Sequence, residues 1–453
     1  MRLSTLALLP ALSPLGLAAG DVPSREVTFA RDVASIVYKH CAGCHRTGGI
    51  APMSLLSFKD ARPWAKSIRE AVVTRQMPPW HADARYGDFV NDARLSETEL
   101  DTIRLWVDQG AKEGNPADLP PAPVFNDDWR IGKPDLIIPI PEEQRIAAGG
   151  PDEYLYFTVP THYDHDLWVQ AVELRPGNRR VVHHAHVYLK APESPAKDPA
   201  QPKHESPSAK YLYQDGHVHH IVPDAPVIND GCGTPDGGYW PGIKPKGEGG
   251  MLGSYLPGRE PDIFPEGYAR KIPAGAILEF QVHYSKTTGR PETDRTSVGF
   301  ILAKEPPRQP LRRVDVSNYF FRIPPGASDQ EVTACYTFDR DVNLLSYVAH
   351  MHYRGKDMRF DLVRPDGRRE TLISIPHYNF NWQTVYRLRT AVPVEKGSQL
   401  RITAHFDNSP NNKFNPDPSK TIRWGEPSNE EMMDGWLEYV LPETSPTERA
   451  SVR

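Results

Sequence analysis

Four cysteines, no long apolar run beyond the N-terminus and a small charge imbalance set the first limits on this chain of 453 residues. The formal net charge is −5 with both signs interspersed, so the sequence offers no basic patch for nucleic acid or for an anionic membrane surface. No later segment approaches the roughly 20 continuous apolar residues of a membrane-spanning helix. We therefore expect neither nucleic acid nor a membrane span.

Proline is abundant, with 46 residues, which favours loops and short strands over long helices. The length indicates several domains. Residues 1–20 combine Arg2, an apolar run and the small residues Ala18, Ala19 and Gly20, a pattern typical of a secretory signal peptide. We expect a periplasmic or secreted protein.

Two of the four cysteines lie in the sequence Cys41-Ala42-Gly43-Cys44-His45. This CxxCH pattern spaces two thiols for thioether bonds to one porphyrin, and the adjacent imidazole of His45 becomes the proximal iron ligand. The sequence therefore predicts covalently attached haem c. A redox or zinc-binding CxxC followed by histidine is the competing interpretation.

The flanking sequence predicts short helices around this motif. Thr28 is a candidate cap for a helix over 30–39, a second helix is expected over about 60–76, and Ser96 with Glu99 forms a capping box for a third that ends at Gly110. Between the last two lies a Met-Pro-Pro loop that begins at Met77.

This order resembles a class I cytochrome c domain, which we place at 21–114, and the resemblance implies that Met77 is the distal iron ligand. Met53, better interpreted as packing, and His81, which would give a bis-histidine haem, remain alternatives.

The remaining chain has a different pattern. Residues 115–150 begin with a proline-rich stretch and are interpreted as a linker. Short runs rich in Val, Tyr and Phe follow, separated by turn residues, which predicts antiparallel strands over 166–174, 181–189, 276–284, 342–353, 358–363 and 399–406. A proline-rich break near 304–310 divides them into halves at 151–305 and 306–443, with a tail at 444–453. The predicted fold is thus a small all-α cytochrome c domain followed by two all-β sandwich domains.

Histidines gather on these predicted strands. The first half holds His183, His184 and His186 on one strand and His283 on another, and the second half holds His350 and His352. Side chains two apart in a strand share a face, so His350 and His352 can approach one ion. Imidazole suits copper, zinc and iron.

Two adjacent methionines, Met432 and Met433, lie in a polar context near the C-terminus. A thioether ligand favours Cu(I), and a purely packing role is less natural for methionine among charged neighbours. The sequence thus offers a soft donor that can complement the imidazoles.

These features resemble the copper type II, ascorbate-dependent monooxygenases, the peptidylglycine α-hydroxylating and dopamine β-monooxygenase family, over most of 150–442. The family has two jelly-roll domains, each with one copper. The resemblance implies an electron-transfer copper on His183, His184 and His283. In the family's second site, a cysteine is followed by a His-x-His strand and, much later, by a methionine. Here Cys335, His350 with His352, and Glu431-Met432 follow in the same order, so the resemblance implies a hydroxylating copper on His350, His352 and Met432.

Two departures from the family pattern matter for these sites. Adjacent strand residues face opposite ways, so His183 and His184 can share a metal only at a bulge or strand end; otherwise His184 and His186 form the chelating pair. The positions that hold the substrate carboxylate in the peptide-amidating branch are Val348, Asp434 and Trp436 here. Peptidylglycine is therefore not the expected substrate.

Other cysteines and histidines leave questions open. Cys232 and Cys335 can pair or stay free, since the family's disulfide framework is largely missing. His217, His219 and His220 lie in a loop-like insertion where a surface role is favoured over a third metal site. His405 is a candidate for support of the hydroxylating site.

Taken together, the residues predict a secreted haem- and copper-dependent monooxygenase that uses O2 and hydroxylates a C–H bond of a small organic substrate. The cofactors are haem c and two copper ions, and an external donor, either an ascorbate-like reductant or a redox protein, supplies electrons. A non-catalytic electron-transfer or copper-binding protein is the alternative. A copper nitrite reductase is disfavoured because neither Cys232 nor Cys335 is followed closely by His and Met ligands.

Overall fold

The computed structural model describes residues 25–125, 128–150, 152–190, 227–233, 250–256, 258–286, 288–425 and 427–443, and the backbone alone at 211–214 and 217–221. The predicted signal peptide at 1–20 and the tail at 444–453 lie outside these residues. No helix of the described part is long and apolar enough to span a membrane.

The N-terminal part contains short helices around one small core. They are η1 (Phe29–Val33), α1 (Ala34–His40), α2 (Phe58–Ala61), η2 (Arg62–Trp64), α3 (Ala65–Val73), α4 (Glu97–Asp108) and η3 (Pro116–Asp118). The capping box of Ser96 and Glu99 is present at the start of α4, as predicted. Thr28 makes no side-chain cap, and the expected helix over 60–76 is divided because Pro63 lies in a 3-10 turn.

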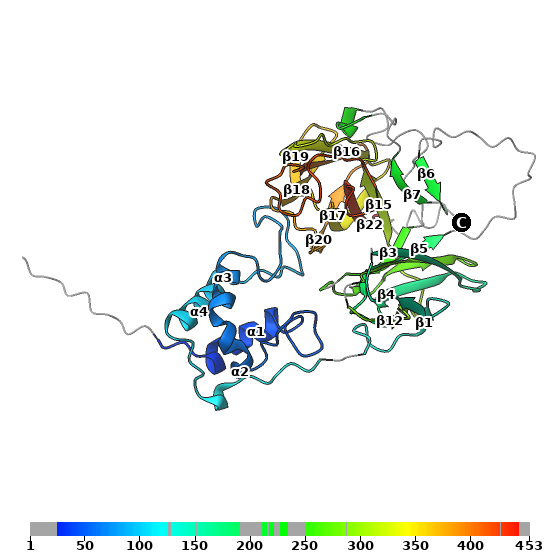
Figure 1. Cartoon of the computed structure of the whole chain (residues 1–453). Coiled ribbons are helices and arrows are strands. Elements are labelled where there is room, and N and C mark those ends of the chain that lie inside the picture. The colour runs from blue at the N-terminus through cyan, green and yellow to red at the C-terminus, as the bar shows by residue number, and fades with distance from the viewer. Residues whose placement is uncertain are drawn as a thin grey trace, which may run out of the picture.

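The predicted fold class, a small all-α cytochrome c domain followed by two all-β jelly-roll sandwich domains, is wrong as stated. The described chain is mostly β, and its α-helices have only 7, 4, 9 and 12 residues, with long irregular segments between them, so no sizeable all-α domain is present. The strands form four larger sheets. Figure 1 shows two separate groups of strands, one with β3, β4 and β5 and the other with β17, β18 and β22. Strand patterns located the strands but did not determine how the sheets are grouped.

The N-terminal β unit, as we call residues 136–310, contains two of the larger sheets. One has the order β1-β13-β4-β10-β14 with β9 beside β4, and the other has the order β3-β11-β5-β8. The strands are β1 (Leu136–Pro139), β2 (Gln144–Ile146), β3 (Glu153–Pro160), β4 (Leu167–Arg175), β5 (Val182–Lys190), β6 (Tyr211–Gln214), β7 (His217–Ile221), β8 (Gly250–Tyr255), β9 (Asp262–Ile263), β10 (Tyr268–Ile272), β11 (Ile277–Tyr284), β12 (Glu292–Asp294), β13 (Ser297–Leu302) and β14 (Gln309–Pro310). One apolar core includes residues from both sheets.

The C-terminal β unit, residues 312–440, contains the other two sheets, in the orders β15-β22-β17-β20 and β16-β21-β18-β19. Its strands are β15 (Arg312–Ser317), β16 (Gln330–Thr337), β17 (Val342–His350), β18 (Gly355–Val363), β19 (Arg369–Ile375), β20 (Val385–Val394), β21 (Gln399–Phe406) and β22 (Asp434–Val440). Alternating burial along these strands, as in β17, places one face of each sheet on a shared core.

A short segment from the insertion after β7 crosses to the C-terminal β unit. Its residue Asp230 bridges to Thr333 of β16, and the amide of Ile228 donates to the carbonyl of Phe320 at 2.9 Å. Cys232 and Cys335 form a disulfide at the same place, a pairing that the sequence left open. This segment is therefore covalently attached to the C-terminal β unit.

Candidate metal centres

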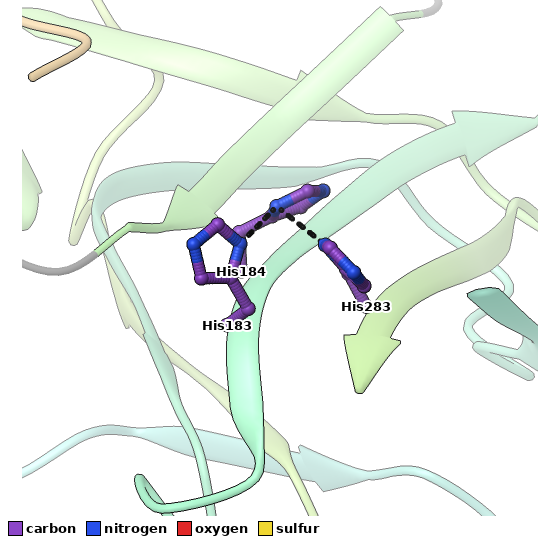
Figure 2. Close-up of side chains that lie close together, drawn as sticks. All are labelled: His183, His184 and His283. Carbon is purple, nitrogen blue, oxygen red and sulfur yellow. Dashed lines mark hydrogen bonds between the residues drawn. The ribbon is translucent and has the colours of Figure 1, made fainter. Parts of the chain in front are cut away.

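His183, His184 and His283, which we call the first site, lie together on paired strands β5 and β11. One ring nitrogen from each lies within 4.8 Å of the others (Figure 2). His184 pairs with His283 and Val182 pairs with Tyr284, so the register shift leaves His183 as a bulged residue. The bulge turns adjacent side chains toward one point, which meets the condition set by the sequence.

The spacing of the first site suits a metal ion. His184 Nδ1 lies 3.3 Å from both His183 Nδ1 and His283 Nδ1. Two imidazole nitrogens bound at about 2.0 Å in tetrahedral geometry are about 3.3 Å apart. Two of the three nitrogen pairs therefore already have the separation that a bound ion requires.

Neighbouring residues orient His283 in the first site. Its Nε2 lies 2.9 Å from Asp152 Oδ2, and Tyr154 stacks on its ring with centroids 4.2 Å apart. A carboxylate on one nitrogen fixes the tautomer and leaves Nδ1 as the free acceptor. Burial lowers the pKa values of His184 and His283, so both imidazoles are neutral, as a metal ligand requires.

His186, the alternative partner of His184, lies beside the first site. The two ring centroids are 5.1 Å apart. Burial lowers the pKa of His186 to about 3. His186 is not among the three residues whose nitrogens gather within 4.8 Å, so the closest grouping is His183 with His184 and His283.

We call His350, His352 and Met432 the second site. His350 is the last residue of β17, and His352 follows it by two positions. Their ring centroids are 5.2 Å apart, and both side chains are buried while Met351 between them points into the core. His350 Nδ1 lies 2.7 Å from Gln383 Oε1, and His352 Nδ1 lies 3.3 Å from the Glu430 carbonyl oxygen. With Nδ1–H donating, each ring keeps Nε2 for an ion.

Glu431 joins the methionine loop to this histidine pair. Its buried carboxylate accepts hydrogen bonds from the backbone amides of His352 at 2.8 Å and Arg354 at 2.6 Å. Burial raises the pKa of Glu431 to about 8, although these amides and the Arg354 charge lower it. The loop that carries Met432 is thereby held beside His352.

The two methionines have different environments. Met433 is fully buried in the core of the C-terminal β unit, whereas Met432 is only partly buried at the edge of that core. A core methionine fills space, and a partly exposed one remains accessible to an ion. Of the two, Met432 is therefore the more accessible candidate ligand.

The two sites lie near each other across the junction of the β units. Burial is the largest cause that lowers the pKa values of His184 and His186, and the proximity of His350 adds to it. A small cavity at this junction has an empty volume of about 340 Å³, including space open to solvent. Its lining includes the charged residues Arg259, Asp262, Arg270, Arg313 and Glu438, together with Trp436.

The positions that depart from the amidating branch shape this junction. Trp436 stacks on His350 with centroids 5.2 Å apart, and the Arg313 guanidinium lies over the Trp436 ring, 4.5 Å from its centroid. Val348 also lines the cavity, and Asp434 is buried. An aromatic ring thus covers one face of His350.

Residues of the haem-attachment motif form the turn that follows α1. Cys41 and Cys44 are free thiols, and the His45 amide donates to the Cys41 carbonyl at 2.8 Å. Burial raises the pKa of Cys41 to about 12 and lowers that of His45, so the imidazole is neutral. The donor set of two reduced thiols and one neutral imidazole fits covalent haem.

The three candidates for the distal ligand of the haem iron, Met77, Met53 and His81, lie in different environments. Met77 is partly buried just after α3, and its amide donates to the Ala71 carbonyl at 3.1 Å. Met53 packs against the helical core, as predicted. His81 lies next to His377 of the C-terminal β unit, whose charge adds to burial in lowering the His81 pKa.

The remaining histidines do not join these sites within the described residues. His405 Nδ1 lies 2.7 Å from Asp357 Oδ1, and its Nε2 lies 3.5 Å from Glu331, on neighbouring strands. Its described contacts therefore do not support the second site. The side chains of His217, His219 and His220 lie outside the described residues.

Sequence reasoning missed the residues that orient the ligands. Asp152 is remote from His283 in sequence, and Gln383 follows His350 by 33 positions in an unremarkable loop. Glu431 was noted only as polar context for Met432. Its position directly before the methionine was the one available signal.

Comparison with curated proteins gave no match. Among solved structures, two crystal forms of PNGF-II share 10% and 11% identity, with TM-scores of 0.31 and 0.28, over 68% of this chain. The matched regions span 66% and 65% of the PNGF-II chains, slightly less than two thirds. A Paenibacillus xanthan lyase has 10% identity and a TM-score of 0.17, over 73% of this chain and 29% of its own. Similarity at this level carries no argument.

One sequence comparison bears directly on the second site. Residues 316–449 match the model of the copper type II ascorbate-dependent monooxygenase, C-terminal domain. The matched region contains His350, His352 and Met432. It supports the family inferred from the motifs, with copper as the metal and a monooxygenase-like function at this coarse level.

Proposed function

We propose that this chain is a secreted haem- and copper-dependent monooxygenase that hydroxylates a C–H bond of a small organic substrate with O2. The observation that carries the proposal is the second site. There, Gln383 and the Glu430 carbonyl hold the Nδ1 atoms of two buried imidazoles and leave both Nε2 atoms for an ion, and Glu431, the residue before Met432, binds the His352 amide, all inside the region that matches the copper monooxygenase domain.

The second site is assigned the reaction with O2. Copper bound there would cycle between Cu(I) and Cu(II) and activate O2. Gln383 and the Glu430 carbonyl hold the two rings, and the thioether of Met432 favours the reduced ion. Burial of His350 and His352 keeps both imidazoles neutral.

The first site is assigned to electron storage, because hydroxylation needs two electrons. His183, His184 and His283 are all imidazoles and offer no thioether, in contrast with the second site. Asp152 holds His283 in one tautomer, which favours a fixed coordination geometry. Such a geometry suits a centre that changes charge without binding substrate.

Haem at Cys41, Cys44 and His45 is the proposed electron input. What supports it is the CxxCH motif, with both thiols reduced and the His45 imidazole neutral. Met77 is the proposed distal ligand. An external one-electron donor, an ascorbate-like reductant or a redox protein, would reduce the haem.

The test is oxygen consumption by the copper-loaded protein with ascorbate and a panel of small organic compounds. We expect at least one compound to accelerate O2 uptake, with one ¹⁸O atom from ¹⁸O2 in the product. A His350→Ala/His352→Ala variant is the control and should lose this activity. Copper that is bound and reduced, but never gives substrate-dependent O2 uptake, would favour the non-catalytic electron carrier instead.

A further inference from the structure

A segment at 80–94, between α3 and α4, lies on the C-terminal β unit. In Figure 1 the blue loop that leaves the helices extends to the edge of the sheet holding β20. The amide of Val90 donates to the Arg387 carbonyl at 2.9 Å, and the Arg389 amide donates to the Asp88 carbonyl at 2.9 Å. Phe89 thereby adds a bridge to the edge strand β20.

Side chains of this segment complete the core of the C-terminal β unit. Trp80, Ala82 and Phe89 are buried in it. The ring centroid of Trp80 lies 5.0 Å from that of Tyr386 on β20, and Tyr386 pairs with Tyr347 on β17. The chain that carries the haem motif is therefore packed against the same sheet as His350.

The haem motif itself has a second contact at the junction of the β units. A Cβ atom built on Gly258 would lie 3.4 Å from Ile50, which follows His45 by five residues, and 3.0 Å from Trp382. The charge of Glu260 raises the pKa of the Cys44 thiol, with burial as the larger cause. The turn that carries Cys44 thus lies beside both β units.

Trp382 connects this contact to the second site. Its neighbour in sequence is Gln383, whose Oε1 lies 2.7 Å from His350 Nδ1. Ile50 and Trp382 therefore both lie next to Gly258, and the backbone and side chains of Trp382 and Gln383, followed by one hydrogen bond, lead from there to a proposed copper ligand. Electron tunnelling falls steeply with distance and is favoured by such bonded connections.

We propose that Trp382 and Gln383 form the electron route from the haem motif to the second site, so that the His350–His352 centre is reduced before the first site. This inference rests on the proposed function and deepens it. One electron leaves ferrous haem, which becomes ferric, and reduces Cu(II) to Cu(I) at the second site, with no bond made or broken. The first site then receives its electron across the junction of the two β units, where the cavity is lined by residues of both.

The experiment follows one electron in anaerobic, oxidised holoprotein. A photoexcited ruthenium complex reduces the haem, haem absorbance reports its reoxidation, and freeze-quenched EPR reports which Cu(II) signal disappears. Trp382→Leu should slow haem reoxidation at least tenfold, with copper content and haem potential unchanged. Trp382→Phe should restore most of the rate, because an aromatic ring returns.

Two controls separate a route from a structural effect. Trp168 is a similarly half-buried tryptophan on β4, and Trp168→Leu should leave the rate unchanged. His283→Ala removes a ligand of the first site and should leave the first phase of haem reoxidation in place. Loss of that phase in His283→Ala would overturn the proposed order, since electrons would then enter at the first site.

Failure of the route and failure of the proposed function give different results. With haem and two coppers bound, an unchanged rate in Trp382→Leu would overturn the route alone. Protein produced with cytochrome maturation that carries no covalent haem would overturn both the haem input and this inference. If Trp382→Leu fails to fold, the His283→Ala variant still decides the order of reduction: loss of its first phase of haem reoxidation would overturn the inference.

Discussion

The two histidine sites are built differently, although both lie on paired β-strands. The first site brings three imidazoles together through a bulge in β5, with His184 Nδ1 3.3 Å from both neighbours. The second site places two imidazoles at the end of β17, and its proposed third ligand, Met432, lies on a loop. One site is set by strand pairing, and the other is completed by a loop.

This difference indicates what each site can do. Ligands fixed on paired strands favour a constant geometry, which suits electron transfer. A thioether on a loop is adaptable, and the pair His350 and His352 leaves coordination positions for other ligands. Glu431 limits that freedom because it binds the backbone of His352 and Arg354.

The largest effect is expected from removing the thioether. Met432→Ala should lower substrate-dependent O2 uptake by more than about 100-fold, since loss of an outer partner alone costs roughly 10–100-fold. The first site should keep its copper. Met433→Ala is the matched control: it should cost about 2–5 kcal/mol of stability, because Met433 is a core residue. Normal O2 uptake by Met432→Ala would make Met433 the next candidate.

Breaking the disulfide should weaken the C-terminal β unit selectively. Cys232 and Cys335 are 103 residues apart, and a crosslink over such a loop contributes roughly 2–5 kcal/mol. Cys232→Ser/Cys335→Ser should therefore lower the unfolding free energy of the region with the second site. Hydrogen exchange of the amides in β16 and β17 measures this loss. Equal loss of protection in β5 and β11 would mean that the two β units unfold together.

Removing the carboxylate behind His283 should affect only the first site. Asp152→Ala should weaken copper there by roughly tenfold, the lower end of the range for such partners, because Asp152 is half exposed. Glu153→Ala is the neighbouring control, as Glu153 pairs with Lys286 instead. Copper titration followed by EPR measures both, and a change at the second site would contradict the assignment.

The last expected effect concerns the pH dependence of the metal-free protein. Burial lowers the pKa of His350 to about 4, against roughly 6.5 in the unfolded chain. Between these values the unfolded state takes up a proton that the folded state does not, so stability falls as pH falls from about 6.5 to 4. One such histidine contributes up to about 1.4 kcal/mol per pH unit. Urea unfolding should show a shallower slope for His350→Gln; an identical slope would mean that His350 is protonated in the fold.

Local patterns predicted the strands that carry the ligands. The expected strands over 181–189 and 276–284 correspond to β5 (Val182–Lys190) and β11 (Ile277–Tyr284), because alternation and turn residues are local signals. The same reasoning stated that His183 and His184 need a bulge. It did not locate one, because a bulge depends on the partner strand.

Contacts between residues far apart in the chain could not be predicted from local sequence patterns. The fold class was wrong because helix signals at 30–39 and 60–76 gave short, interrupted helices and because strand patterns do not determine how sheets group. The contact of Phe89 with β20 joins residues about 300 positions apart, which no local pattern encodes. Gln383 and Asp152 were missed for the same reason.

The central claim is that the chain holds two separate copper centres, and metal analysis tests it most directly. Protein made with cytochrome maturation and loaded with copper should contain two coppers and one haem per chain. His183→Ala/His184→Ala and His350→Ala/His352→Ala should each retain one copper, and the haem should be unaffected. Fewer than two coppers in the unmodified protein, or zinc in their place after copper reconstitution, would contradict the account.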